Sequence, residues 1–165
     1  MIRLLTQAFD PGAELNRFSA GRTVTGAVAS FLGLARSADA VTGPALELEA
    51  YPGFTERRIE AFVATAIDRF GLHDALVVHR IGLIGAGEPI VLVLTAAPHR
   101  REAFEACDYL MDYLKSQAPF WKREFGPDGP RWVEPTGRDL KDIERWTPPR
   151  GDPPPIAPKI EENRP

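Results

Sequence analysis

The chain has 165 residues, 44% of them hydrophobic, and a net charge of −3, which suits one domain with a buried core. So small a charge argues against binding to nucleic acid or to an anionic membrane, and no apolar run reaches the ~20 residues that span a bilayer. The single cysteine, Cys107, excludes a disulfide within the chain, and the N-terminus lacks the apolar stretch of a secretory signal. We therefore expect a soluble, cytoplasmic protein.

The first third of the chain predicts strands around a short helix. Residues 1–9 and 23–32 are rich in apolar and β-branched residues, which is typical of strands. Asp10 followed by proline predicts the start of a helix that runs to about residue 18. Alternation of apolar and acidic residues over 46–51 predicts a half-exposed strand.

Two long helices flank a predicted hairpin. An apolar stripe predicts a helix that Thr55 caps and Gly71 ends. Residues 75–83 and 89–96 are apolar, β-branched runs, and the glycine-containing segment between them predicts a hairpin. Within it, the alternation of a strand puts one of His79 and Arg80 inward and the other outward.

The second long helix begins near Pro98 and ends before Pro119, because proline suits a first helical turn and disfavours helix in the residue before it. One apolar face with helical spacing is formed by Phe104, Cys107, Met111 and Leu114. Free cysteines are commonly buried as small hydrophobes, and we expect this of Cys107.

The C-terminal part predicts a turn at 125–130, an edge strand at 131–133 and a short helix within 139–146. Residues 147–165 contain seven prolines among nineteen residues, so a disordered or extended tail is expected after a domain at 1–146. The predicted class is α+β, a single domain with a mixed or antiparallel sheet, a hairpin and two main helices.

Basic residues lie at the start of the second long helix, at His99 and Arg100. Cations at a helix N-terminus oppose the helix dipole, so helix stability does not explain them. An anion held by these side chains and by the free backbone N–H groups would explain them. The alternative is a surface His-Arg pair with no ligand.

Two of the four lysines, Lys115 and Lys122, lie on either side of Pro119. The turn there would bring both ammonium groups to one pocket, where a lysine neutralises an oxyanion, donates a proton or acts as a nucleophile. The alternative for Lys115 is a solvated lysine that the helix dipole favours at a C-terminus. The three histidines and one cysteine have no metal-ligand spacing, so no metal or other cofactor is expected.

The central stretch resembles the signature of the MoaE family, the large, catalytic subunit of molybdopterin synthase. The matching segments there are His99-Arg100, 103–107, 112–115 and 119–124. Further matches extend the resemblance over about 2–146 and comprise 26–28, Phe31-x-Gly33 with Arg36, 46–56, 79–88 and 131–133.

The resemblance implies an α/β hammerhead fold and a homodimer inside a heterotetramer. A small ubiquitin-like sulfur-carrier subunit, MoaD-like, would insert its C-terminal Gly-Gly thiocarboxylate into the large subunit. Two sulfurs would pass to cyclic pyranopterin monophosphate to form molybdopterin. Lys115 and Lys122 would be catalytic, and Arg36, His99 and Arg100 would bind substrate, some of them across the dimer interface.

Two alternatives from other classes stay open on the sequence. One is a binding module that holds a phosphorylated metabolite in the same cationic pocket without transforming it and needs no carrier protein. The other is an assembly subunit that has lost activity, against which the presence of both lysines with His99 and Arg100 argues.

Overall fold

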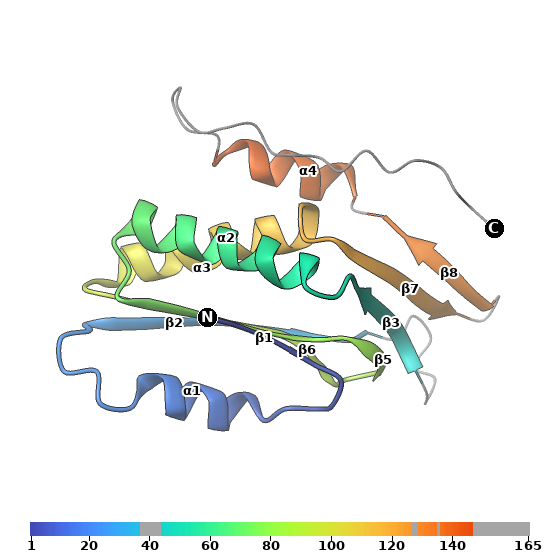
Figure 1. The fold of residues 1–165 in the computed structure, drawn as a ribbon, viewed down its shortest axis with the longest axis horizontal. Coiled ribbons are helices and arrows are strands. Elements are labelled where there is room, and N and C mark those ends of the chain that lie inside the picture. The colour runs from blue at the N-terminus through green and yellow to red at the C-terminus, as the bar shows by residue number, and fades with distance from the viewer. Residues whose placement is uncertain (37–43, 127–128, 135, 147–165) are drawn as a thin grey trace.

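A computed structural model describes residues 1–36, 44–126, 129–134 and 136–146. The predicted tail at 147–165 and part of the predicted turn at 125–130 lie outside the described residues. Within them the chain forms four helices and eight strands in two four-stranded sheets. Helices and strands are mixed in one domain (Figure 1), so the predicted α+β class is confirmed, although two sheets replace the expected single one.

The first sheet has the strand order β1-β4-β6-β2. Its strands are β1 (Ile2–Leu5), β4 (Asp74–Arg80), β6 (Pro89–Ala97) and β2 (Ala27–Leu34). β1 is parallel to β4, and the other pairs are antiparallel. β4 and β6 are almost entirely buried because helices cover both faces, which explains their continuous apolar sequences.

The second sheet has the order β5-β3-β7-β8 and is wholly antiparallel. Its strands are β5 (Gly82–Gly85), β3 (Pro44–Ala50), β7 (Phe120–Gly126) and β8 (Gly129–Val133). The predicted edge strand at 131–133 is confirmed. The predicted strand over 75–83 is wrong in its last part, since the chain leaves the first sheet at Gly82. There φ is +84°, a conformation that glycine adopts without a steric penalty.

The helices cover both faces of the first sheet. They are α1 (Pro11–Ser19), α2 (Phe54–Phe70), α3 (Arg100–Ser116) and α4 (Gly137–Glu144). α1 lies on one face, α2 and α3 on the other, and α4 lies over α3 (Figure 1). The predicted cap at Asp10 is confirmed, because its carboxylate accepts hydrogen bonds from two backbone N–H groups of the first turn.

Two details of the helices differ from expectation. Thr55 is not a cap: Gly53 precedes the helix, and the buried Thr55 hydroxyl accepts from the Tyr51 N–H and donates to the Pro119 carbonyl. This bond ties the start of α2 to the start of β7. Phe104 was expected on the buried face of its helix, but its side chain is 65% exposed and lines a hollow near the start of α3.

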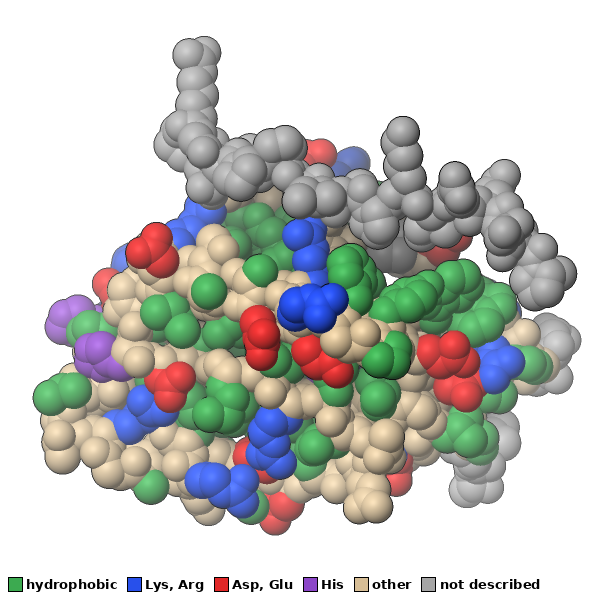
Figure 2. Space-filling view, viewed as in Figure 1, with side chains coloured by type: hydrophobic (Ala, Val, Ile, Leu, Met, Phe, Trp, Pro, Cys, Tyr) green, Lys and Arg blue, Asp and Glu red, His purple; other side chains and the backbone are tan. Residues whose placement is uncertain are grey.

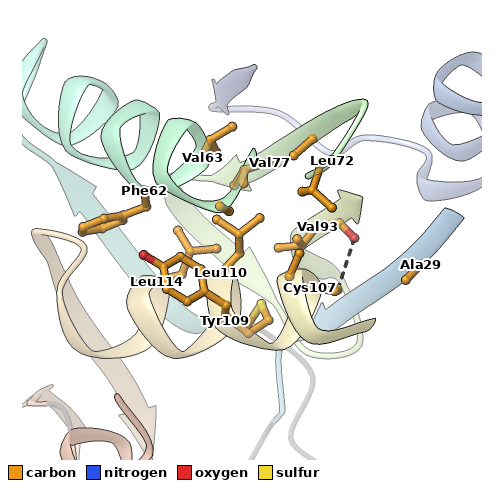
Figure 3. Packing of buried hydrophobic residues seen from close by; sticks show 14 of the residues in the cluster. Ala29, Phe62, Val63, Leu72, Val77, Val93, Cys107, Tyr109, Leu110 and Leu114 are labelled. Carbon is orange, nitrogen blue, oxygen red and sulfur yellow. Dashed lines mark hydrogen bonds between the residues drawn. The ribbon is translucent and has the colours of Figure 1, made fainter. Parts of the chain in front are cut away.

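α2, α3 and the first sheet enclose the main core (Figure 3). Ile59, Leu110, Val77 and Val93 have no exposed surface, and burial of each such side chain stabilises the fold by roughly 1.5–3 kcal/mol. Cys107 is buried as predicted, and burial raises the pKa of its thiol to about 12. Because α3 packs into this core from Ala103 to Leu114, the core fixes the positions of both ends of the helix.

Candidate active site

The predicted site residues on α3 lie at its two ends. His99 immediately precedes the helix and Arg100 begins it, whereas Lys115 is in the last turn. At 1.5 Å per residue, the fifteen steps from Arg100 to Lys115 span about 22 Å. The two groups are too far apart for one small molecule to touch both within a single chain.

An open hollow of about 500 Å³ lies at the N-terminal end of α3. It is lined by His99, Arg100, Arg101, Glu102, Phe104 and Glu105. Both His99 and Arg100 are exposed, and neither forms an ion pair with any described residue. The neighbouring Arg101 forms a long ion pair, in which its Nη1 atom lies 3.7 Å from Glu105 Oε1. His99 and Arg100 thus have no acidic partner among the described residues and lie beside free backbone N–H groups, which suits an anion, although Glu102 and Glu105 also line the hollow.

The C-terminal end of α3 presents lysines with acidic partners. Lys115 Nζ lies 3.4 Å from Asp139 Oδ1 of α4, and Lys122 Nζ lies 2.7 Å from Glu124 Oε1 on the same strand. The hydrogen bond from Lys122 lowers the pKa of Glu124. The pKa of Asp139 is lowered first by the Thr136 hydroxyl and further by Lys115. Both ammonium groups remain solvent-accessible, at 61% and 39% side-chain exposure.

β7 also carries Trp121, whose side chain is exposed on the face of the strand opposite to that of Lys122. Trp121 packs edge-on against Tyr51 and Trp132, with ring centroids 6.5 and 5.4 Å apart. Figure 2 shows hydrophobic side chains gathered over this part of the molecule. Arg123 Nε donates to Glu47 Oε2 at 2.9 Å, which fixes β7 against β3. The sequence did not predict β7, because a proline, aromatic residues and charges follow one another there without alternation.

Arg36 is exposed and directly follows Ala35, whose backbone is held by two hydrogen bonds. The Ala35 N–H donates to the Glu88 carbonyl at 2.9 Å, and the Gly87 N–H donates to the Ala35 carbonyl at 2.7 Å. These two bonds attach the end of β2 to the turn between β5 and β6. The position of Arg36 therefore depends on the shape of that turn.

The turn is itself held by Arg80, which sequence reasoning missed. Arg80 Nη1 donates to Glu88 Oε2 at 2.7 Å, and the Gly85 N–H donates to the same oxygen at 2.9 Å. The Gly85 and Arg80 hydrogen bonds lower the pKa of Glu88. The expectation that one of His79 and Arg80 points outward was wrong, since both are buried. The available signal was the glutamate eight residues after the arginine, across the predicted hairpin.

Asp112 anchors α4 over α3. Its Oδ2 atom accepts hydrogen bonds from Arg145 Nη2 at 2.7 Å and from the indole N–H of Trp146. The Trp146 ring packs against Phe70 and Tyr109. This clasp keeps Asp139 close to Lys115. The sequence carried no signal for it, because an aspartate within a helix ordinarily faces solvent.

The sheet register decides which end each predicted residue occupies. Leu34 pairs with Pro89 and Ala27 with Ala97, and α3 returns along the sheet from the end of β6. Arg36 therefore lies at the same end as Lys115, with Lys122 on the strand that follows, while His99 and Arg100 lie at the opposite end (Figure 1). A single chain brings three of the five predicted residues to one end and two to the other.

The described residues contain neither a metal-binding cluster nor a membrane-spanning helix. No group of three or more His, Cys, Asp or Glu side chains is arranged to hold a metal ion within the described ranges. Among the same residues, no helix combines the length and apolarity needed to cross a bilayer.

Comparison with known proteins places this architecture in a family. Residues 4–117 match the model of the family described as MoaE protein. The chain is 60% identical over 146 residues to the molybdopterin synthase catalytic subunit of Caulobacter vibrioides, covering 88% of this chain and 97% of that protein. The solved molybdopterin biosynthesis MoaE protein of Burkholderia ambifaria superposes with a TM-score of 0.74 at 42% identity, covering 88% and 97% of the two chains. Molybdopterin synthase from Staphylococcus aureus gives a TM-score of 0.69 at 26% identity, covering 79% and 94%. The chain therefore belongs to the MoaE family.

Proposed function

We propose that this chain is the catalytic subunit of a molybdopterin synthase and works in the cytoplasm. As a sulfurtransferase, it would convert cyclic pyranopterin monophosphate to molybdopterin in molybdenum cofactor biosynthesis. The names of its relatives support this function. The structural observation that carries it is the set of exposed cationic side chains fixed at the ends of α3 and β2, which suits an anionic substrate and an anionic carrier tail.

The chain needs a partner that supplies sulfur. Its one cysteine, Cys107, is buried and its thiol pKa is raised to about 12, so it offers no thiolate near neutral pH. A small carrier with a C-terminal Gly-Gly thiocarboxylate, similar to MoaD, provides the sulfur in activated form. The chemistry then requires charge stabilisation and positioning rather than a resident redox group.

Lys115 and Lys122 have separate roles in this proposal. Lys115 stabilises or covalently captures the reacting carbonyl centre of the thiocarboxylate, and Lys122 fixes the thiocarboxylate or the substrate phosphate. The acidic partners Asp139 and Glu124 hold the ammonium groups in the absence of ligand. An exposed ion pair is worth at most about 1 kcal/mol, so an incoming carboxylate or phosphate exchanges with either partner at little cost.

The substrate-binding set is completed by a second copy of the chain. Arg36 contributes from the lysine end, while His99 and Arg100 reach the substrate from the other protomer of a homodimer. Two such dimeric sites, each with its own carrier subunit, make a heterotetramer. The separation of about 22 Å between Arg100 and Lys115 supports this arrangement, because one chain alone does not gather the five residues.

Reconstitution tests the function. Purified chain is mixed with the thiocarboxylated carrier and cyclic pyranopterin monophosphate, and dithiolene formation is measured. Molybdopterin should appear only when all three are present. Saturable binding of the pyranopterin without product, together with failure to capture the carrier in a pull-down, would instead favour a non-catalytic binding module.

A further inference from the structure

Pro119 is the joint between the two lysines of the candidate site. Lys115 lies in the last turn of α3, Lys122 lies on β7, and Pro119 lies between them in the chain. The Ala118 N–H still donates to the Tyr113 carbonyl at 3.1 Å, so the backbone stays attached to the helix up to the residue before the proline. The direction in which β7 leaves α3, and with it the place of Lys122 relative to Lys115, is therefore set at Pro119.

A buried hydroxyl holds this joint. Thr55, in the first turn of α2, has no exposed surface. Its hydroxyl donates to the Pro119 carbonyl at 3.1 Å and accepts from the Tyr51 N–H at 2.9 Å. Because proline has no N–H, the carbonyl is the one backbone group through which Pro119 forms a hydrogen bond. That bond joins segments 64 residues apart in the sequence.

Other contacts meet at the same corner of the molecule. Ala50, at the end of β3, pairs with Phe120 at the start of β7. The Phe120 ring stacks on the buried His79 ring, with centroids 4.3 Å apart. Figure 1 shows the start of α2, the end of β3 and the start of β7 beside the end of α3. The ladder fixes the register of β7, whereas Thr55 holds the backbone one residue earlier, where the chain turns away from the helix.

We propose that Thr55 is a positioning residue that sets Lys122 relative to Lys115. The proposal rests on the proposed function, because it takes both lysines to act in one reaction. The Thr55 hydroxyl contacts neither substrate nor carrier; it fixes the angle between the end of α3 and β7. A displacement of about 1 Å at a reacting group lowers the rate by up to about 10²-fold. One hydrogen bond at the joint therefore affects turnover, although both ammonium groups lie in solvent.

A graded series at Thr55 tests the bond without removing the side chain. Thr55→Val puts a methyl group in place of the hydroxyl, so the Pro119 carbonyl and the Tyr51 N–H both lose a partner. Thr55→Ser keeps the hydroxyl, and Thr55→Cys keeps a weaker donor and acceptor. The kcat for molybdopterin formation should fall about 10- to 100-fold in Thr55→Val. It should stay near the wild-type value in Thr55→Ser and lie between the two in Thr55→Cys.

Thr95 provides a matched control for the loss of stability. It is also fully buried, and its hydroxyl donates to the Ala103 carbonyl at 2.7 Å, which ties β6 to the first half of α3, away from the lysines. Thr95→Val should lower the urea midpoint of unfolding about as much as Thr55→Val but keep the wild-type kcat. Equal losses of kcat in the two valine variants, or a wild-type kcat in Thr55→Val, would overturn the proposal.

Hydrogen exchange measures the joint without turnover. In Thr55→Val, peptides that contain Tyr51 and residues 119–124 should take up deuterium faster than in Thr95→Val, because the corner opens locally. The same rate in the two variants would contradict the proposal. If the wild-type protein forms no molybdopterin, the proposed function fails instead, and the exchange difference still decides whether Thr55 holds β7.

Discussion

The two ends of α3 carry basic residues in opposite electrostatic settings. At the N-terminal end, His99 and Arg100 lie where the helix dipole is positive, and no described acidic group pairs with them. At the C-terminal end, the dipole favours Lys115, and Asp139 neutralises it. The cations at the first end have no acidic partner among the described residues, whereas Lys115 and Lys122 at the second end each have one.

This contrast separates binding from chemistry. An uncompensated cation attracts any phosphate or carboxylate, which suits capture of substrate. An acidic partner holds the ammonium group of a lysine in position until the substrate or carrier anion replaces that partner. Such positioning suits a group that acts on the reacting centre. The predictions below test each half of that division, from the largest expected effect to the smallest.

Removal of the Lys115 ammonium should have the largest effect. Lys115→Ala should lower the rate of molybdopterin formation about 10²–10³-fold, the usual result of deleting one charge-stabilising group at a reacting centre. Lys141→Ala, an exposed lysine on α4, is the matched control and should retain full activity. Turnover by Lys115→Ala at the wild-type rate would remove Lys115 from the mechanism.

The buried His79 makes folding at the lysine end depend on pH. Burial lowers the pKa of His79 to about 4, against the hydrogen bond that its Nδ1–H donates to the Arg80 carbonyl. As pH falls from 6.5 toward 4, the His79 ring becomes protonated in the unfolded state but stays neutral in the folded state. The free energy of unfolding should therefore fall by up to about 3 kcal/mol.

Urea unfolding at several pH values measures this loss. His79→Phe, which keeps a ring to stack on Phe120, should lose less stability over the same interval than the wild type. His99→Phe, at the exposed end of α3, is the control and should follow the wild-type slope. Identical slopes for His79→Phe and wild type would show that His79 does not control this transition.

The Arg80–Glu88 pair should affect binding more than turnover. Arg80→Met removes the donor that shapes the turn holding Ala35, so Arg36 should lose its fixed position. The KM for cyclic pyranopterin monophosphate should rise about tenfold while kcat changes little, the pattern expected when uniform binding is lost. Arg17→Met, which breaks an ion pair on α1, should leave both constants unchanged. An equal fall in kcat and kcat/KM for Arg80→Met would contradict a positioning role through Arg36.

The smallest effect is expected from a change of Asp139, the acidic partner of Lys115. Asp139→Asn keeps a side chain able to bond the Thr136 N–H but no longer neutralises Lys115. Carrier binding at low salt should become about two- to fivefold tighter, within the range of an exposed ion pair. High salt should abolish the difference by screening. Weaker carrier binding at low salt would mean that Asp139 positions Lys115 for the carrier and does not compete with the carrier for its ammonium group.

Local patterns allowed much of the fold to be predicted from the sequence. The Asp10 cap, the apolar stripe of α2 and the buried face around Cys107 all depend on spacings along one segment, and the structure confirms them. The division into two sheets was missed, because it depends on a single backbone angle at Gly82 and on pairing between segments far apart in sequence.

For the site, too, the sequence predicted residue types within single segments but not contacts between distant segments. The sequence placed His99 near the start and Lys115 near the end of one predicted helix, and their residue types indicated anion chemistry, but it did not reveal the neighbours of each. The Arg80–Glu88 pair and the Asp112 clasp were missed, since ordinary charged residues become informative only when their partners are known. The family resemblance implied that some of these residues act across a dimer interface, and the length of α3 supports that expectation.

Mixing two impaired variants tests completion by a second copy most directly. Lys115→Ala and His99→Ala proteins are co-refolded, and molybdopterin formation is compared with each variant alone. If the two groups act across the dimer, about half the dimers are mixed and each has one intact site, so activity should recover to about a quarter of wild type. A mixture no more active than its separate components would contradict the account.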